Sequence, residues 1–119
     1  METRTLTVTL QPDWKAAMRR VAHAAEKAAG YQGETLNFDS PAAFFSHLTE
    51  KRWMIVHALQ GAGTVGVRDL ARRVGRDVRR VHEDATALVN LGLIERTEKG
   101  ELMCPFSDIH VDMHLLHAA

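Results

Sequence analysis

Two apolar patterns of helical period, separated by a three-residue break, constrain the fold of this chain more than any other feature. The apolar positions are Val67, Leu70, Ala71 and Val74 in the first pattern, and Val78, Val81, Ala85, Leu88 and Val89 in the second. Gly75 breaks the chain between them, Asp77 is a good N-cap for the second helix, and Gly92 is a good terminator. A two-turn helix, a tight break and a longer helix form the arrangement of a helix-turn-helix motif.

The residues on either side extend this motif. Thr49 is a good cap for a preceding helix over about residues 50–60, whose apolar side holds Trp53 or its neighbours Ile55, Val56 and Leu59. Residues 93–97 and 101–104 are expected to be two strands, with the glycine of Glu98-Lys99-Gly100 at a left-handed turn position. The sequence therefore predicts an α+β fold with a winged helix-turn-helix over residues 49–119, in which residues 109–115 form a last strand.

The first 48 residues are predicted to be a strand–helix–strand extension. Residues 5–10 alternate apolar and β-branched polar side chains, which indicates a half-buried strand with Leu6, Val8 and Leu10 inward. Residues 14–28 carry apolar side chains at helical spacing, Gly30 closes that helix, and residues 35–38 read as a short strand. We expect residues 1–48 either to mediate dimerisation or to cover one side of the winged domain.

A further short helix is expected just before residue 49. Ser40 is a suitable cap and Pro41 suits the first helical position. The apolar side of this helix is expected to hold Phe44, Phe45 and Leu48.

The net charge of zero hides an uneven distribution. Residues 1–50 carry five basic and six acidic side chains, residues 51–99 carry ten and six, and residues 100–119 carry none and three. The positive charge therefore gathers around the predicted helix-turn-helix. Local potential matters more than the total for binding a polyanion, so this distribution favours double-stranded DNA as the partner.

The basic residues of this region are the candidate DNA contacts. Arg76, Arg79 and Arg80 fall at the start of the predicted recognition helix, where arginine can bond to guanine edges in the major groove. Phosphate contacts are expected from Lys51, with its neighbour Arg52, and from Arg72 and Arg73, and wing contacts from Arg96 and Lys99. Winged-helix proteins that bind DNA usually do so as dimers on paired half-sites, so we expect a homodimer.

Some charged residues in the same region have a structural interpretation. Asp84 would repel phosphate, and we expect it to orient Arg80 through an i−4 pair, with cytosine readout by Glu83 or Asp84 as the alternative. Arg68 and Arg73 are open to pairing with Asp69 or Asp84.

Residues 48–106 resemble prokaryotic winged-helix regulators of MarR-like type and antitoxin components of toxin–antitoxin modules. The resemblance rests on the run from Val67 to Asp84, above all its GRDVRRVHED portion, on the junction from Leu88 to Arg96, and on Leu48 to Arg52 and Pro105-Phe106. It implies a prokaryotic, dimeric, operator-binding regulator, and an operator-bound repressor is the expected function. The alternatives are an antitoxin that masks a toxin and regulates its own operon, and a winged helix that binds only protein.

Other functional classes find little support. No Gly-rich phosphate loop or nucleophile–base spacing predicts an enzyme, and no cofactor is expected. His110, Asp112 and His114 would share one strand face, but a polar strand face explains them more simply than a metal site. The single cysteine, Cys104, is expected to be a buried, inert thiol. The absence of an apolar span or leader sequence favours a cytoplasmic protein without membrane contact.

Overall fold

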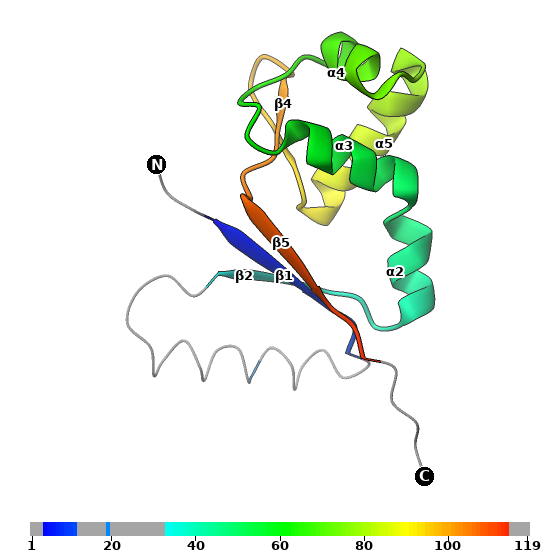
Figure 1. The fold of residues 1–119 in the computed structure, drawn as a ribbon, viewed down its shortest axis with the longest axis vertical. Helices are drawn as coiled ribbons and strands as arrows, with labels where there is room; N and C mark the ends of the chain where they lie inside the picture. The colour runs from blue at the N-terminus through cyan, green and yellow to red at the C-terminus, as the bar shows by residue number, and fades with distance from the viewer. Residues whose placement is uncertain (1–3, 12–18, 20–32, 115–119) are drawn as a thin grey trace. The chain divides into compact units, whose positions relative to one another are not determined.

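The computed structural model describes residues 4–11, 19 and 33–114 of the 119-residue chain (Figure 1). Within these residues helices and strands both occur, which confirms the predicted α+β class. The chain divides into two units, one from His47 to Ser107 and one that combines the residues up to Ser46 with those from Asp108 onward. The amphipathic helix predicted over residues 14–28 lies outside the described residues, apart from Arg19.

Three helices build the first unit: α3 (Glu50–Leu59), α4 (Val67–Val74) and α5 (Val78–Leu91). Their ends follow from the local sequence, because Arg52 N donates to Thr49 Oγ1 at 3.4 Å and Arg80 N donates to Asp77 Oδ2 at 3.3 Å. Gly75 (φ 67°) ends α4 in the left-handed conformation that favours glycine. The predicted helix–break–helix over residues 67–92 is therefore present.

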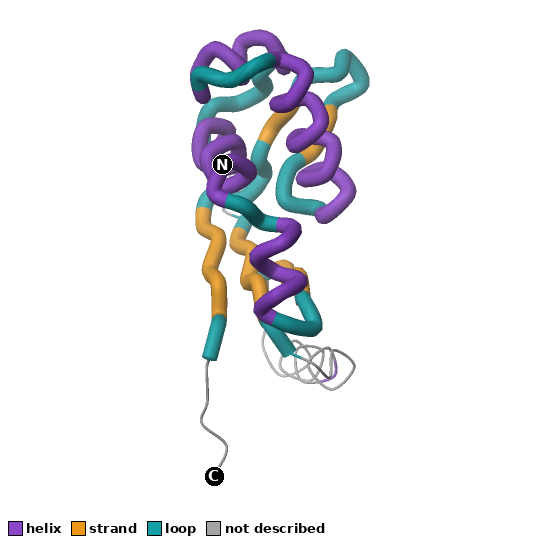
Figure 2. The backbone as a smooth tube through the Cα atoms, turned by 90° about the vertical axis from the view of Figure 1, so that its right-hand side faces the viewer, coloured by secondary structure: helices purple, strands orange, loops and turns teal. Residues whose placement is uncertain are grey.

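The three helices pack against one another (Figure 2). The fully buried side chains of these helices include Ile55, Leu59, Leu70, Val81, Ala85 and Leu88. Val78 was expected to face inward and is instead 37% exposed. It occupies the first position of α5, and the buried side of that helix starts one turn later, at Val81. Trp53 is only half-buried, whereas its neighbours Ile55, Val56 and Leu59 are buried.

A short hairpin follows α5. Strands β3 (Glu95–Arg96) and β4 (Leu102–Met103) pair antiparallel, and Gly100 (φ 83°) takes the left-handed position expected in the turn. On the other side of β4, Val65 and Leu102 exchange two backbone hydrogen bonds of 2.8 Å. The hairpin is thereby attached to the segment that enters α4.

The second unit holds a three-stranded parallel sheet with the order β2–β1–β5 (Figure 1). Its strands are β1 (Thr5–Thr9), β2 (Glu34–Asn37) and β5 (Asp108–Asp112). Leu6 and Val8 are buried as predicted, whereas Leu10 lies beyond the end of β1 and is half-buried. The predicted division at residue 48 differs from the observed one, because β5 pairs with β1 and leaves the unit that contains the hairpin.

Helix α2 (Pro41–His47) belongs mainly to this second unit. Ala43 N donates to Ser40 Oγ at 3.1 Å, which is the predicted cap. Phe44 is buried and meets Phe38 edge to face, but Phe45 is 60% exposed, so only one of the two adjacent rings faces the core. Among the described helices, none combines the length and apolar character needed to cross a bilayer.

Two positions on α3 test this packing. Leu59 is fully buried and Met54 is 46% exposed on the same helix. Leu59→Ala is expected to lower the free energy of unfolding by about 2–5 kcal/mol, because it removes buried methyl groups and leaves a cavity. Met54→Ala is the matched control and should change it by less than about 0.5 kcal/mol. Urea denaturation measures both, and equal losses would contradict the described orientation of α3.

Candidate nucleic-acid interface

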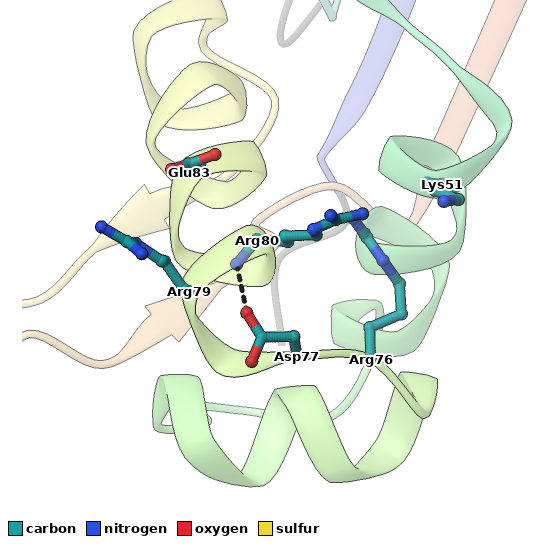
Figure 3. Close-up of a pocket in the computed structure, with 6 residues that line it drawn as sticks. All are labelled: Lys51, Arg76, Asp77, Arg79, Arg80 and Glu83. Carbon is teal, nitrogen blue, oxygen red and sulfur yellow. Dashed lines mark hydrogen bonds between the residues drawn. The ribbon is translucent and has the colours of Figure 1, made fainter.

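An open pocket of the first unit gathers several of the basic residues singled out in the sequence (Figure 3). Its lining residues are Lys51, Arg76, Asp77, Arg79, Arg80 and Glu83. They come from the first turn of α3, the break between α4 and α5, and the first two turns of α5. The fold thus brings residue 51 together with residues 76–83, as expected for one basic surface.

Asp84 lies at the centre of the charge network behind this pocket. Its carboxylate accepts hydrogen bonds from Arg52 Nε at 3.1 Å and from Arg76 Nη2 at 2.7 Å, and its side chain is only 19% exposed. The expected pair of Asp84 with Arg80 is therefore wrong, because the carboxylate turns to the inner side of α5 and finds these two guanidinium groups. One carboxylate thus joins α3, the helix–helix break and α5.

Arg52 extends the network by one more contact. Its Nη1 donates to the carbonyl oxygen of His47 at 2.8 Å, so its guanidinium bridges the last residue of α2 and the middle of α5. The sequence suggested a phosphate contact for Arg52, but in the structure its charge is matched by Asp84. The acidic residue on the inner side of α5 was the one sequence signal for this pairing. Its partner Arg52 lies 32 positions away, so the sequence alone did not identify it.

The pKa of Asp84 reflects two opposing effects. Burial of the carboxyl group by itself raises its pKa, because desolvation disfavours the charged form. The hydrogen bonds and positive charges of Arg76 and Arg52 act the other way and prevail, so the pKa of Asp84 lies below its ordinary value of 3.8. The carboxylate is therefore held in its ionised form at neutral pH.

Three of the pocket side chains are cations without an ion-pair partner among the described residues. Lys51, Arg79 and Arg80 are exposed and form no ion pair with any of the described residues. Arg76 differs from them, since it is only 15% exposed and paired with Asp84. In Figure 3 the Arg80 side chain runs toward the tip of Arg76, on the side of the pocket where Lys51 lies, whereas Arg79 points the opposite way. The predicted major-groove residues thus fall into one fixed and two free arginines.

The two arginines near the end of α4 share a single acidic partner. Asp69 lies 3.5 Å from Arg72 Nη2 and 3.0 Å from Arg73 Nη2. Exposed ion pairs of this kind contribute at most about 1 kcal/mol and are screened by salt. Both arginines therefore stay on the surface with charge available to a polyanion.

The hairpin offers less positive charge than the sequence suggested. Arg96 is exposed and its Nη2 donates to Thr86 Oγ1 at 3.2 Å, so its side chain folds back along α5. Lys99 is exposed in the turn. The same stretch carries three carboxylates, on Glu95, Glu98 and Glu101, so the hairpin as a whole is not basic.

The other residues singled out in the sequence are not among those that line this pocket. Cys104 is buried as predicted, and burial raises the pKa of its thiol, which donates weakly to the carbonyl oxygens of Leu93 and Phe106, each at 3.6 Å. On β5 and just beyond it, His114 Nε2 lies 2.8 Å from Asp112 Oδ1. No group of three or more metal-ligating side chains occurs within the part of the chain that the structure describes.

Comparison with known proteins gives one relationship. A model of the HVO_A0114 family matches residues 47–111, which is 65 of the 119 residues. The chain belongs to the HVO_A0114 family. The matched stretch contains the whole pocket and the Asp84 network, so both lie in the part of the chain that defines HVO_A0114 membership. No curated protein and no solved structure matches the chain.

The Asp84 network predicts a stability difference between two adjacent acidic residues. Asp84→Asn removes the charge that two largely buried guanidinium groups share, and should lower the free energy of unfolding by about 1–3 kcal/mol. Glu83→Gln is the matched control, because Glu83 is exposed at the preceding position of the same helix. Urea denaturation at pH 7 measures both variants. A loss in Glu83→Gln as large as that in Asp84→Asn would contradict the network.

The lowered pKa of Asp84 also predicts a pH dependence. The folded state binds the proton less tightly than the unfolded state, so the carboxylate stabilises the fold above its unfolded pKa, and this contribution is lost as pH falls through the lower folded pKa. The unfolding free energies of the wild type and Asp84→Asn should differ by a constant amount between about pH 5 and 7, and this difference should shrink progressively as the pH falls below about 4. A gap that widens in acid would show that the pKa is raised instead.

Proposed function

We propose that residues 49–104 are a winged helix-turn-helix and that the protein is a sequence-specific DNA-binding transcriptional regulator. In support, α3, α4 and α5 are followed by a short hairpin, which is the order of elements in that fold. α5 has 14 residues and would serve as the recognition helix in the major groove. The resemblance to MarR-like regulators agrees with this interpretation.

One observation carries the proposal. The first turn of α5 presents two exposed arginines, Arg79 and Arg80, while the negative charge of Asp84 on the inner side of the helix is already matched by Arg52 and Arg76. DNA binding needs a rigid helix whose first turns face the phosphates and base edges. Asp84 supplies rigidity by joining α5 to Arg52 and Arg76. Because that carboxylate is neutralised inside the network, it does not oppose DNA at the outer face.

The charges suggest that α5 contributes more to DNA binding than the hairpin does. Lys51, Arg79 and Arg80 line the pocket, and Arg72 lies on the neighbouring helix with its side chain 79% exposed. Lys99 and Arg96 are accompanied by three glutamates. The hairpin would therefore contact the DNA backbone through Lys99 alone.

The proposed mode of action is repression by a homodimer. Two copies that bind neighbouring half-sites multiply affinity and fix the spacing of the operator. A small DNA-bound dimer represses simply by blocking access of the polymerase. Sedimentation of the purified chain together with its operator duplex tests this arrangement, and a complex of one copy per duplex would contradict it.

DNA binding itself is tested with duplexes selected from random DNA. Fluorescence anisotropy should give a log–log dependence of affinity on salt concentration with a slope of about −4.5, as expected for about five phosphate contacts. Arg79→Ala combined with Arg80→Ala should weaken binding by about 100-fold or more, because both free guanidinium groups are lost. Both residues are exposed, so the unfolding free energy should stay within about 0.5 kcal/mol.

The matched control for this variant is Arg68→Ala. Arg68 is an exposed arginine of the same unit that does not line the pocket. Its removal should cost at most about threefold in affinity, the size of one peripheral charge contact. Failure of the wild type to bind any selected duplex, or equal losses in the control and the double variant, would refute the proposed function.

A further inference from the structure

The arginines at the start of α5 differ in direction and partners, and this points to a division of roles within the proposed DNA-binding surface. Arg80 and Arg76 run toward the same side of the pocket, where Lys51 lies, and Arg79 points to the other side of the helix (Figure 3). Three cations thus converge from α3, the helix–helix break and α5. Base readout and backbone contact need not come from the same residues.

Arg76 is fixed in this pocket with unused bonding capacity. Its Nη2 is held by Asp84 at 2.7 Å. Its Nη1 is buried and is the one buried side-chain nitrogen or oxygen without a hydrogen-bond partner among residues 4–11, 19 and 33–114. A buried donor without an acceptor is unfavourable, so an acceptor atom that reaches it would be bound favourably. Arg80, which runs toward this group, is exposed and long enough to move aside.

The acidic residues of the pocket do not supply that acceptor. The Asp77 carboxylate caps α5 by accepting from Arg80 N at 3.3 Å. Glu83 lies one turn beyond Arg80 on α5 and has no ion-pair partner within the described part of the chain. With four cations and two carboxylates, the lining keeps an excess of positive charge. Guanidinium and ammonium groups that converge in this way repel one another until an anion binds between them.

A phosphodiester group fits these requirements. It carries one negative charge and its oxygens accept several hydrogen bonds, including paired bonds from arginine. The adjacent N-terminus of α5 adds favourable backbone dipoles. We propose that this pocket binds one phosphate of the DNA backbone through Lys51, Arg76 and Arg80, which leaves Arg79 to contact base edges. This assignment rests on the proposed DNA-binding function.

The two roles predict different behaviour of two neighbouring variants. Arg80→Ala should weaken binding to the selected duplex and to a scrambled duplex by the same factor, on the order of tenfold, and should reduce the steepness of the salt dependence by about 1. Arg79→Ala should weaken binding to the selected duplex much more than to the scrambled one. A loss in Arg80→Ala that depends on base sequence would overturn the assignment.

Neutral methylphosphonate substitutions locate the phosphate directly. Each backbone phosphate of the selected duplex is replaced in turn, and anisotropy is measured for the wild type, Arg80→Ala and the control Arg68→Ala. One position per half-site should weaken wild-type binding by about tenfold and leave the affinity of Arg80→Ala almost unchanged, because the contact is already lost. If Arg80→Ala stays as sensitive as the wild type at every position, the phosphate site is refuted while DNA binding stands. If the wild type binds no duplex, both fail.

Inorganic phosphate distinguishes a backbone group from a free anion. At constant ionic strength it should compete with the duplex only in the millimolar range, because the pocket is open and a free phosphate lacks the remaining contacts of a duplex. Micromolar binding of inorganic phosphate to the full chain, abolished by Arg80→Ala, would overturn the assignment to the DNA backbone.

Discussion

The pairing of one carboxylate with two guanidinium groups joins three elements of the first unit. Asp84 on α5 is largely shielded from water, and a charge in that position is tolerated only when it is matched. Arg52 and Arg76 match it from α3 and from the break between α4 and α5. The relative positions of these elements are therefore specified by charge as well as by the apolar contacts beneath them.

This pairing also divides the basic residues of the region into two groups. Arg52 and Arg76 face inward and fix the fold, while Lys51, Arg79 and Arg80 remain exposed. In the sequence the members of the two groups lie within four positions of each other, and residue type does not distinguish one group from the other. The proposed DNA-binding surface depends on this division, because an unmatched Asp84 would place a negative charge close to the phosphates.

The second unit shows a different constraint. Its central strand, β1, lies near the start of the chain and pairs with β5, more than 100 residues later. The helical unit is thus inserted in the sequence between α2 and β5. Parallel pairing needs a long connection between the strands, and here the connection is a folded unit of its own. We expect such distant contacts to form late in folding, because loop closure costs entropy before the pairing stabilises the chain.

The sequence alone determined the local structure: the caps at Thr49 and Asp77, the break at Gly75, the left-handed Gly100, and the apolar sides of α3, α4 and α5. These features depend on residues within one or two turns of each other, so their physical causes are visible in a short stretch of chain. Only the tertiary structure decided which partner each charged residue takes and which strand each strand meets. The Asp84 partners, the Val65–Leu102 bridge and the pairing of β5 with β1 join residues 8 to more than 100 positions apart. Ion pairs and strand pairing join residues through space, and no periodic pattern along the chain marks which residues will pair. The sequence therefore indicated the charged residues and the strands but did not indicate their partners.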